Sequence, residues 1–95
     1  MLIVSVLFRV PPEELEALRP AMAAIIEASR AEPGNILFTF GEDILAPGTI
    51  RAFEVFRDDD ALKAHTASEH FKAWRAASGQ YAREERRLFD ATLRP

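Results

Sequence analysis

Hydrophobic and polar residues alternate along the chain in two patterns, one typical of strands and the other of helices. Four segments rich in Val, Ile, Leu and Phe predict strands: residues 2–10, 36–40, 50–57 and 88–93. Apolar residues spaced three and four apart predict a long helix over 13–30, and Asp58 and Ser68 are suitable N-caps for two shorter helices before Gly79. The polar residues 80–86 are expected to form a turn of helix or a loop. The order β-α-β-β-α-β predicts an α+β, ferredoxin-like fold, with residues 1–95 as a single domain.

The predicted sheet is apolar on both of its faces. In the first strand, Val4, Val6 and Phe8 alternate with Ile3 and Leu7, so neither side has the polar character of a solvated face. The two helical crossovers should place their helices on one face only. The other face would then leave an apolar patch of several hundred Å², which is large for a monomer. We therefore expect a homodimer, in which a second copy covers this face.

Composition and missing motifs narrow the function classes. The formal charge of −3 argues against nucleic acid or an anionic membrane as the main partner. No cysteine is present, which excludes thiolate chemistry and zinc–thiolate sites. The apolar start is too short to span a bilayer and lacks the features of a signal peptide, so a cytoplasmic location is expected. Dinucleotide, P-loop and nucleophile-elbow motifs do not occur, and no cofactor is predicted.

The candidate chemistry lies in one strand and in the stretch "LKAHTASEHFKAW" at residues 62–74. Glu54 is a carboxylate in the middle of an apolar strand, where it is costly unless it lies at the rim or is hydrogen-bonded. A carboxylate near His65 would fix the imidazole tautomer and raise its basicity. The spacing of His65 and His70 does not match a zinc motif, so no metal site is predicted. From spacing alone, packing is favoured over catalysis for His65, and more strongly for His70 and Trp74.

The stretches "EPGNILFTF", "FEVFRDDDALKAHTASEHFKAW" and "RRLFDATL" together resemble the antibiotic biosynthesis monooxygenase family. The resemblance covers nearly the whole chain and is most specific at Glu54, Phe56, Ala64-His65 and residues 68–71. It implies a ferredoxin-like subunit, a dimer that closes a β-barrel, and a pocket between the sheet and the helices. Some members oxidise quinols with molecular oxygen and no cofactor. One relative in pattern isomerises a phosphorylated signal, and haem-cleaving members need an Asn on the first strand that is missing here.

The resemblance implies a cofactor-independent monooxygenase that acts on a small quinol or polyphenol with molecular oxygen. His65 would be the base, and Glu54 would orient it directly or through water. Phe38, Phe56, His70 and Trp74 are expected to wall the substrate pocket.

Two alternatives stay open. An isomerase of a small hydroxyketone, with or without a phosphate group, would use the same Glu54 and His65; for a phosphorylated substrate, Lys72, Arg75 or Arg87 would serve as cations at the pocket mouth. The second alternative is a dimeric module that binds a small molecule without turnover.

Overall fold

The computed structural model describes residues 1–95 and consists of one antiparallel sheet with three helices. The elements in chain order are β1 (Leu2–Arg9), α1 (Pro12–Arg30), β2 (Asn35–Glu42), β3 (Thr49–Phe56), α2 (Asp59–Ala67), α3 (Glu69–Ser78) and β4 (Glu84–Asp90). The strand order is β2-β3-β1-β4, and each neighbouring pair is antiparallel. This topology confirms the predicted ferredoxin-like α+β fold. No helix is long and apolar enough to cross a membrane.

The helix boundaries follow from local side-chain caps. The Asp58 carboxylate accepts a hydrogen bond from the Ala61 amide at 2.8 Å, and this bond starts α2. The Ser68 hydroxyl accepts one from the Phe71 amide at 3.1 Å, which starts α3. Ser68 itself has an extended backbone, so the chain bends there between the two helices. Consequently His65 lies in the last turn of α2 and His70 in the first turn of α3.

The last strand differs from the sequence prediction of 88–93. It begins at Glu84 and ends at Asp90, so it includes residues expected to form a loop. Its pairing with β1 contains a register shift, and Glu85 has a φ of 52°, as expected where one extra residue bulges from a strand. The bulge interrupts the alternation on which strand prediction depends. Its charged residues are tolerated because β4 is an edge strand, with solvent along one side.

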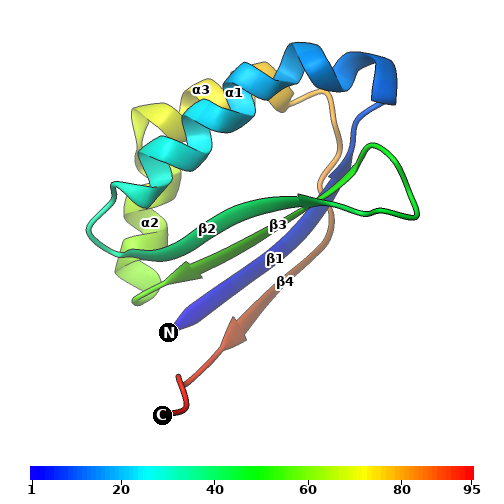
Figure 1. Ribbon diagram of the computed structural model, residues 1–95. Helices are drawn as coiled ribbons and strands as arrows, with labels where there is room; N and C mark the ends of the chain where they lie inside the picture. The colour runs from blue at the N-terminus through cyan, green and yellow to red at the C-terminus, as the bar shows by residue number, and fades with distance from the viewer.

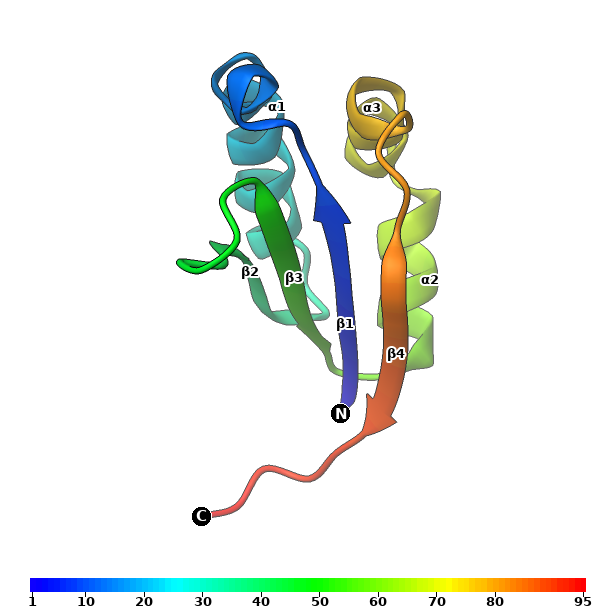
Figure 2. The same cartoon turned by 90° about the vertical axis from the view of Figure 1, so that its right-hand side faces the viewer.

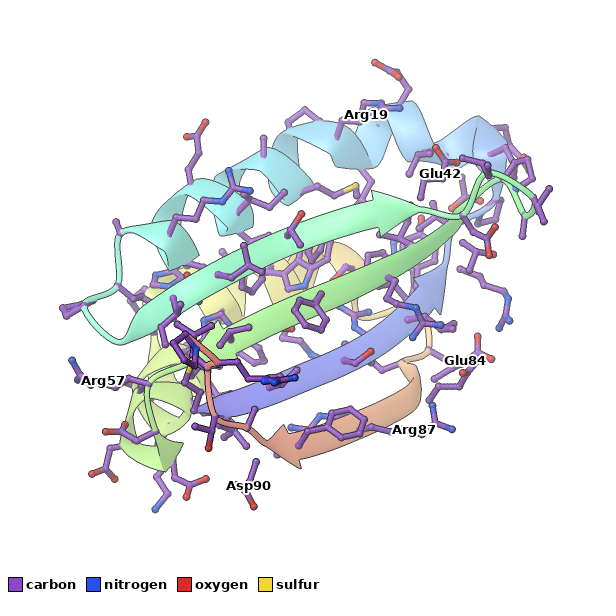
Figure 3. The ribbon with its side chains drawn as sticks, turned by 60° about the horizontal axis from the view of Figure 1, so that its bottom comes forward. Arg19, Glu42, Arg57, Glu84, Arg87 and Asp90 are labelled. Atoms are coloured by element: carbon purple, nitrogen blue, oxygen red, sulfur yellow. The ribbon has the colours of Figure 1, made fainter.

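The two faces of the sheet have different surroundings. All three helices lie on one face, as Figures 1 and 2 show. Between them and the sheet lies the main core: Phe8, Val10, Leu15, Leu18, Ile25, Phe38, Ile50 and Trp74. No helix covers the opposite face, which Figure 3 turns toward the viewer. There the register places the partly exposed side chains of Leu37, Phe53 and Phe89.

Candidate functional site

Glu54 lies in the middle of the sheet and points toward the helices. On β3 it is paired with Val4 of β1 and Phe38 of β2, so its carboxyl group is surrounded by apolar side chains. Only 9% of the residue is exposed. The pKa of Glu54 is raised from 4.5 to about 7, mainly by burial; the charges of Arg86 and Arg83 oppose this shift, and that of Glu32 adds to it. At neutral pH, a large share of the molecules therefore carry a protonated Glu54.

His65 is the most enclosed ionisable side chain on the helical layer. It is 2% exposed, and its ring packs against Phe38, Phe56 and Phe71, with centroid distances of 5.5, 5.1 and 5.2 Å. Its Nε2 atom lies 3.8 Å from Glu54 Oε1, which is longer than a direct hydrogen bond. The structure thus brings the two predicted residues to the same place without a direct bond between them.

The carboxylate that binds His65 is Glu32, a residue that sequence reasoning missed. Its Oε2 atom lies 2.8 Å from His65 Nδ1, and the same oxygen contacts His70 Nε2. Glu32 is in the turn between α1 and β2, 33 residues before His65. It is the first residue of the quoted "EPGN" stretch, but nothing in the local pattern separates it from an ordinary exposed turn residue.

A close backbone approach holds this turn against α2. Any Cβ added at Gly34 would lie 2.4 Å from the Ala61 Cβ, so only glycine allows the two segments to approach so closely. Ala61 and His65 are four residues apart and share one face of α2. The Arg57 amide also donates to the Gly34 carbonyl at 2.9 Å. Together these contacts place Glu32 beside the His65 ring.

The three side chains form an arrangement suited to general-base chemistry. An ionised carboxylate only accepts hydrogen bonds, so His65 Nδ1 and His70 Nε2 each donate a hydrogen bond to Glu32. In neutral His65 the other nitrogen, Nε2, then carries a lone pair on the side where Glu54 lies. The same three ligand atoms lie within 4.8 Å of one another and are of the kinds that divalent metals such as zinc prefer.

A cavity of about 100 Å³ lies between the sheet and the helices α2 and α3. Glu54, His65, Phe38 and Trp74 line it, with further apolar residues of β1, β2 and β3. Phe56, which was predicted to be part of the wall, instead lies behind the His65 ring and is completely buried. Trp74 contacts the rings of Phe8 and Phe40 at centroid distances of 5.7 and 5.4 Å.

His70 lies outside this cavity. It lines a separate small hollow with α1 residues and Trp74, and its ring centroid is 6.0 Å from that of His65. Its contact with Glu32 makes it a second donor to the carboxylate that holds His65. The structure therefore connects His70 to the site through Glu32 and not through the cavity wall.

Arginine side chains line the remaining part of the cavity. They are Arg75 of α3, Arg83 of the segment before β4, and Arg86 of β4. Of the cations considered from sequence, only Arg75 lines the cavity. Lys72 is exposed and paired with Glu69, and Arg87 is paired with Glu85.

Comparison with known proteins agrees with this fold. The sequence model of antibiotic biosynthesis monooxygenases matches residues 1–77. The chain belongs to the antibiotic biosynthesis monooxygenase family. It is 28% identical over 74 residues to a Bacillus subtilis protein named "Putative monooxygenase YcnE", with 78% of each sequence covered.

Solved structures of similar proteins have the same architecture. Rv0793 from Mycobacterium tuberculosis is 28% identical, with a TM-score of 0.80 over 99% of this chain and 96% of that one. A Nitrosomonas europaea protein described as a "Putative antibiotic biosynthesis monooxygenase" has a TM-score of 0.89 at 22% identity, over 98% of this chain and all of that one. The latter similarity concerns the fold alone.

Proposed function

We propose that this member of the family is a cofactor-independent monooxygenase that oxidises a small quinol with molecular oxygen. The observation that carries the proposal is that His65, which is bound by Glu32, lines a mainly apolar cavity together with Glu54. Glu32 binds Nδ1 of His65 at 2.8 Å, so that Nε2 is available to a ligand in the cavity. A buried, oriented imidazole of this kind is suited to remove a phenolic proton.

In the proposed reaction, His65 Nε2 takes a proton from one hydroxyl of the quinol. The resulting anion transfers one electron to O2, and the two radicals combine to form a carbon–oxygen bond next to the ring oxygen. Protonated His65 returns its proton to the peroxide. The O–O bond then breaks as the ring C–H proton leaves, and Glu54 exchanges that proton so that hydroxide departs as water. One oxygen atom remains on the ring, the other becomes water, and the ring supplies all four electrons.

The surrounding residues have supporting roles in this proposal. Phe38 and Trp74 offer flat apolar surfaces for a planar ring and exclude water from it. Glu32 acts through His65 and is a positioning residue. The burial that raises the pKa of Glu54 to about 7 gives it the mixed protonation that a proton-exchanging group needs near neutral pH.

The test is oxygen uptake with 1,4-dihydroxybenzene, measured on the wild type and on His65→Asn. Asparagine can still donate to Glu32 from a position near Nδ1, but it has no atom that replaces Nε2. We expect wild-type uptake with one atom of ¹⁸O₂ in the product, and a loss of about 10²–10⁴-fold in the variant with an unchanged melting temperature. Equal turnover by the two proteins would refute the role of His65.

A chelator treatment separates this chemistry from metal catalysis. Because Glu32, His65 and His70 could together bind a divalent cation, the protein is dialysed against EDTA before the assay. We expect full activity after dialysis. Activity that disappears and returns with added Zn²⁺ or Fe²⁺ would replace the proposal with a metal-dependent one.

The isomerase alternative is supported by the arginines that line the cavity, since they would suit a phosphorylated substrate. It requires no oxygen. Turnover of a phosphorylated hydroxyketone under anaerobic conditions, without oxygen uptake on any quinol, would favour it. Binding of both compound types without any turnover would indicate a binding module.

We further propose that the protein works as a homodimer joined through the helix-free face of the sheet. Leu37, Phe53 and Phe89 are 41%, 37% and 48% exposed on this face. An apolar face of this kind is stabilised when a second copy covers it. Size-exclusion chromatography with light scattering should give twice the 10.7 kDa chain mass.

A further inference from the structure

Three arginines at the outer end of the cavity have no acidic partner. Arg75, Arg83 and Arg86 line the cavity, and none has a carboxylate oxygen within 4 Å. Five other arginines of the chain do form such pairs: Arg9, Arg19, Arg51, Arg57 and Arg87. Arg30 and Arg94 are also without an acidic partner, so three of the five unpaired arginines line this one cavity.

Arg83 is held rigidly in this position. Its Nη1 donates to the carbonyls of Ser78 and Tyr81 at 2.9 and 2.7 Å, and its Nη2 donates to the Ser78 hydroxyl at 2.7 Å. Its guanidinium carbon lies 4.9 Å from the Phe8 ring centroid and 5.5 Å from that of Trp74. All of these partners are neutral, so the fixed positive charge of Arg83 is not compensated.

The acidic groups of the site do not balance the arginines. Glu54 is the only carboxyl group that lines the cavity, and none of the three arginines has a nitrogen within 4 Å of its oxygens. Glu32 accepts hydrogen bonds from the two histidines and does not line the cavity. Burial lowers the pKa of Arg83 and repulsion by the charge of Arg75 lowers it further, while Glu54 only partly offsets these effects. An anionic ligand would relieve this repulsion.

The groups that line the cavity differ in exposure. Arg75 and Arg86 are exposed to solvent, whereas His65 and Glu54 are buried. The cavity of about 100 Å³ is smaller than the apolar space of about 150 Å³ that holds benzene, so it can enclose no more than one aromatic ring, part of which would lie among the exposed arginines. A ring can then occupy the inner part while a charged substituent stays near water.

We propose that the natural ligand is a single aromatic ring bearing an oxyanion, a carboxylate or a phosphate, that Arg75, Arg83 and Arg86 bind. This deepens the proposed function, because it names the substrate class, and its placement of a ring hydroxyl near His65 rests on that proposal. Guanidinium groups present paired donors that match the oxygens of either anion. The oxyanion fixes the orientation of the ring, so that a ring hydroxyl on the side away from it faces His65.

The test measures binding under anaerobic conditions, so that it does not depend on turnover. Trp74 is the single tryptophan and lines the cavity, which makes its fluorescence a direct reporter. The probes are 2,5-dihydroxybenzoate, the uncharged 1,4-dihydroxybenzene and phenyl phosphate. We expect one of the two anions to bind at least about tenfold more tightly than the uncharged ring, as one charge-assisted hydrogen bond would give. The tighter anion identifies whether the group is a carboxylate or a phosphate.

The variants separate the arginine cluster from general charge effects. The double variant Arg75→Gln/Arg86→Gln removes two exposed guanidinium groups that make no hydrogen bond within the protein, and it should bring the affinity ratio close to one. Arg87→Gln is the matched control, since Arg87 follows Arg86 on β4 but is paired with Glu85 outside the cavity. It should keep the wild-type ratio.

Two results would overturn the inference. One is equal affinity of the wild type for charged and uncharged rings, or no binding of any probe. The other is a preference for anions that persists in the double variant. A preference that depends on the arginines, in a protein without oxygen uptake, supports the anion site and refutes only the monooxygenase proposal.

Discussion

Glu54 provides the sharpest test of the electrostatics of this site. The substitution Glu54→Gln keeps the shape of the side chain but removes its titration. In the folded protein, burial raises the pKa of Glu54 from 4.5 to about 7, so the fold favours the protonated carboxyl group. At pH values between these two pKa values, the folded state binds more protons than the unfolded state does. The free energy of unfolding must therefore fall as pH rises through this window.

The size of the effect follows from the two pKa values. One pKa unit corresponds to about 1.36 kcal/mol, so the interval from 4.5 to about 7 amounts to about 3 kcal/mol. Below pH 4.5 the ionisation cost is absent, and above about pH 7 it is present in full. The glutamine variant has no such cost at any pH. Relative to the wild type, it should therefore gain about 3 kcal/mol between about pH 4 and pH 8.5.

Urea unfolding followed by far-UV circular dichroism measures this difference. Both proteins are unfolded at a fixed protomer concentration at several pH values, because association would change the apparent stability. Glu27→Gln is the control, since Glu27 is an exposed glutamate on α1, and its curve should run parallel to that of the wild type. If the Glu54→Gln and wild-type stabilities change in parallel with pH, the carboxyl group is not desolvated as the structure indicates.

Three further outcomes are expected. Glu32→Gln should reduce quinol turnover about 10²-fold or more, with little change in the binding of 1,4-dihydroxybenzene, because the neutral amide no longer stabilises the positive charge that His65 gains as a base; a KM increase with unchanged kcat would contradict this. Gly34→Ala should lower the free energy of unfolding by about 1–3 kcal/mol in thermal melting, since the new Cβ would lie 2.4 Å from the Ala61 Cβ. Gly41→Ala is the control and should cause no such loss, because a Cβ at Gly41 meets no atom within 4 Å. Phe53→Asp should yield monomers in light scattering while Ile44→Asp, in the exposed β2–β3 loop, leaves the dimer; a dimeric Phe53→Asp would place the interface elsewhere.

The fold could be predicted from the sequence because its signals are local. Alternating Val, Leu and Phe positions define β1, and the caps Asp58 and Ser68 lie where the structure has them. Local rules failed at β4, where the bulge at Glu85 shifts the alternation by one residue. A strand at the edge of a sheet can also carry charged residues, so its composition resembled that of a loop.

The candidate site could be predicted only in part. Glu54 and His65 were recognisable because each is a polar residue at a position that the periodicity places toward the interior. Glu32 was not, because an acid in a turn is ordinary, and its importance arises only where the turn packs against α2. The same is true of Arg83 and Arg86, which looked like members of a solvated, charged stretch.

What could be predicted and what could not differ in how far apart in the sequence the interacting residues are. Strand alternation, helix periodicity and caps involve residues within about four positions of one another, so they can be recognised in the linear chain. The bond between Glu32 and His65 joins residues 33 positions apart, and the cavity combines residues of α2, α3 and β4 with residues of β1, β2 and β3. The desolvation that raises the pKa of Glu54 depends on every group packed around it. Such distances and environments exist only once the chain has folded.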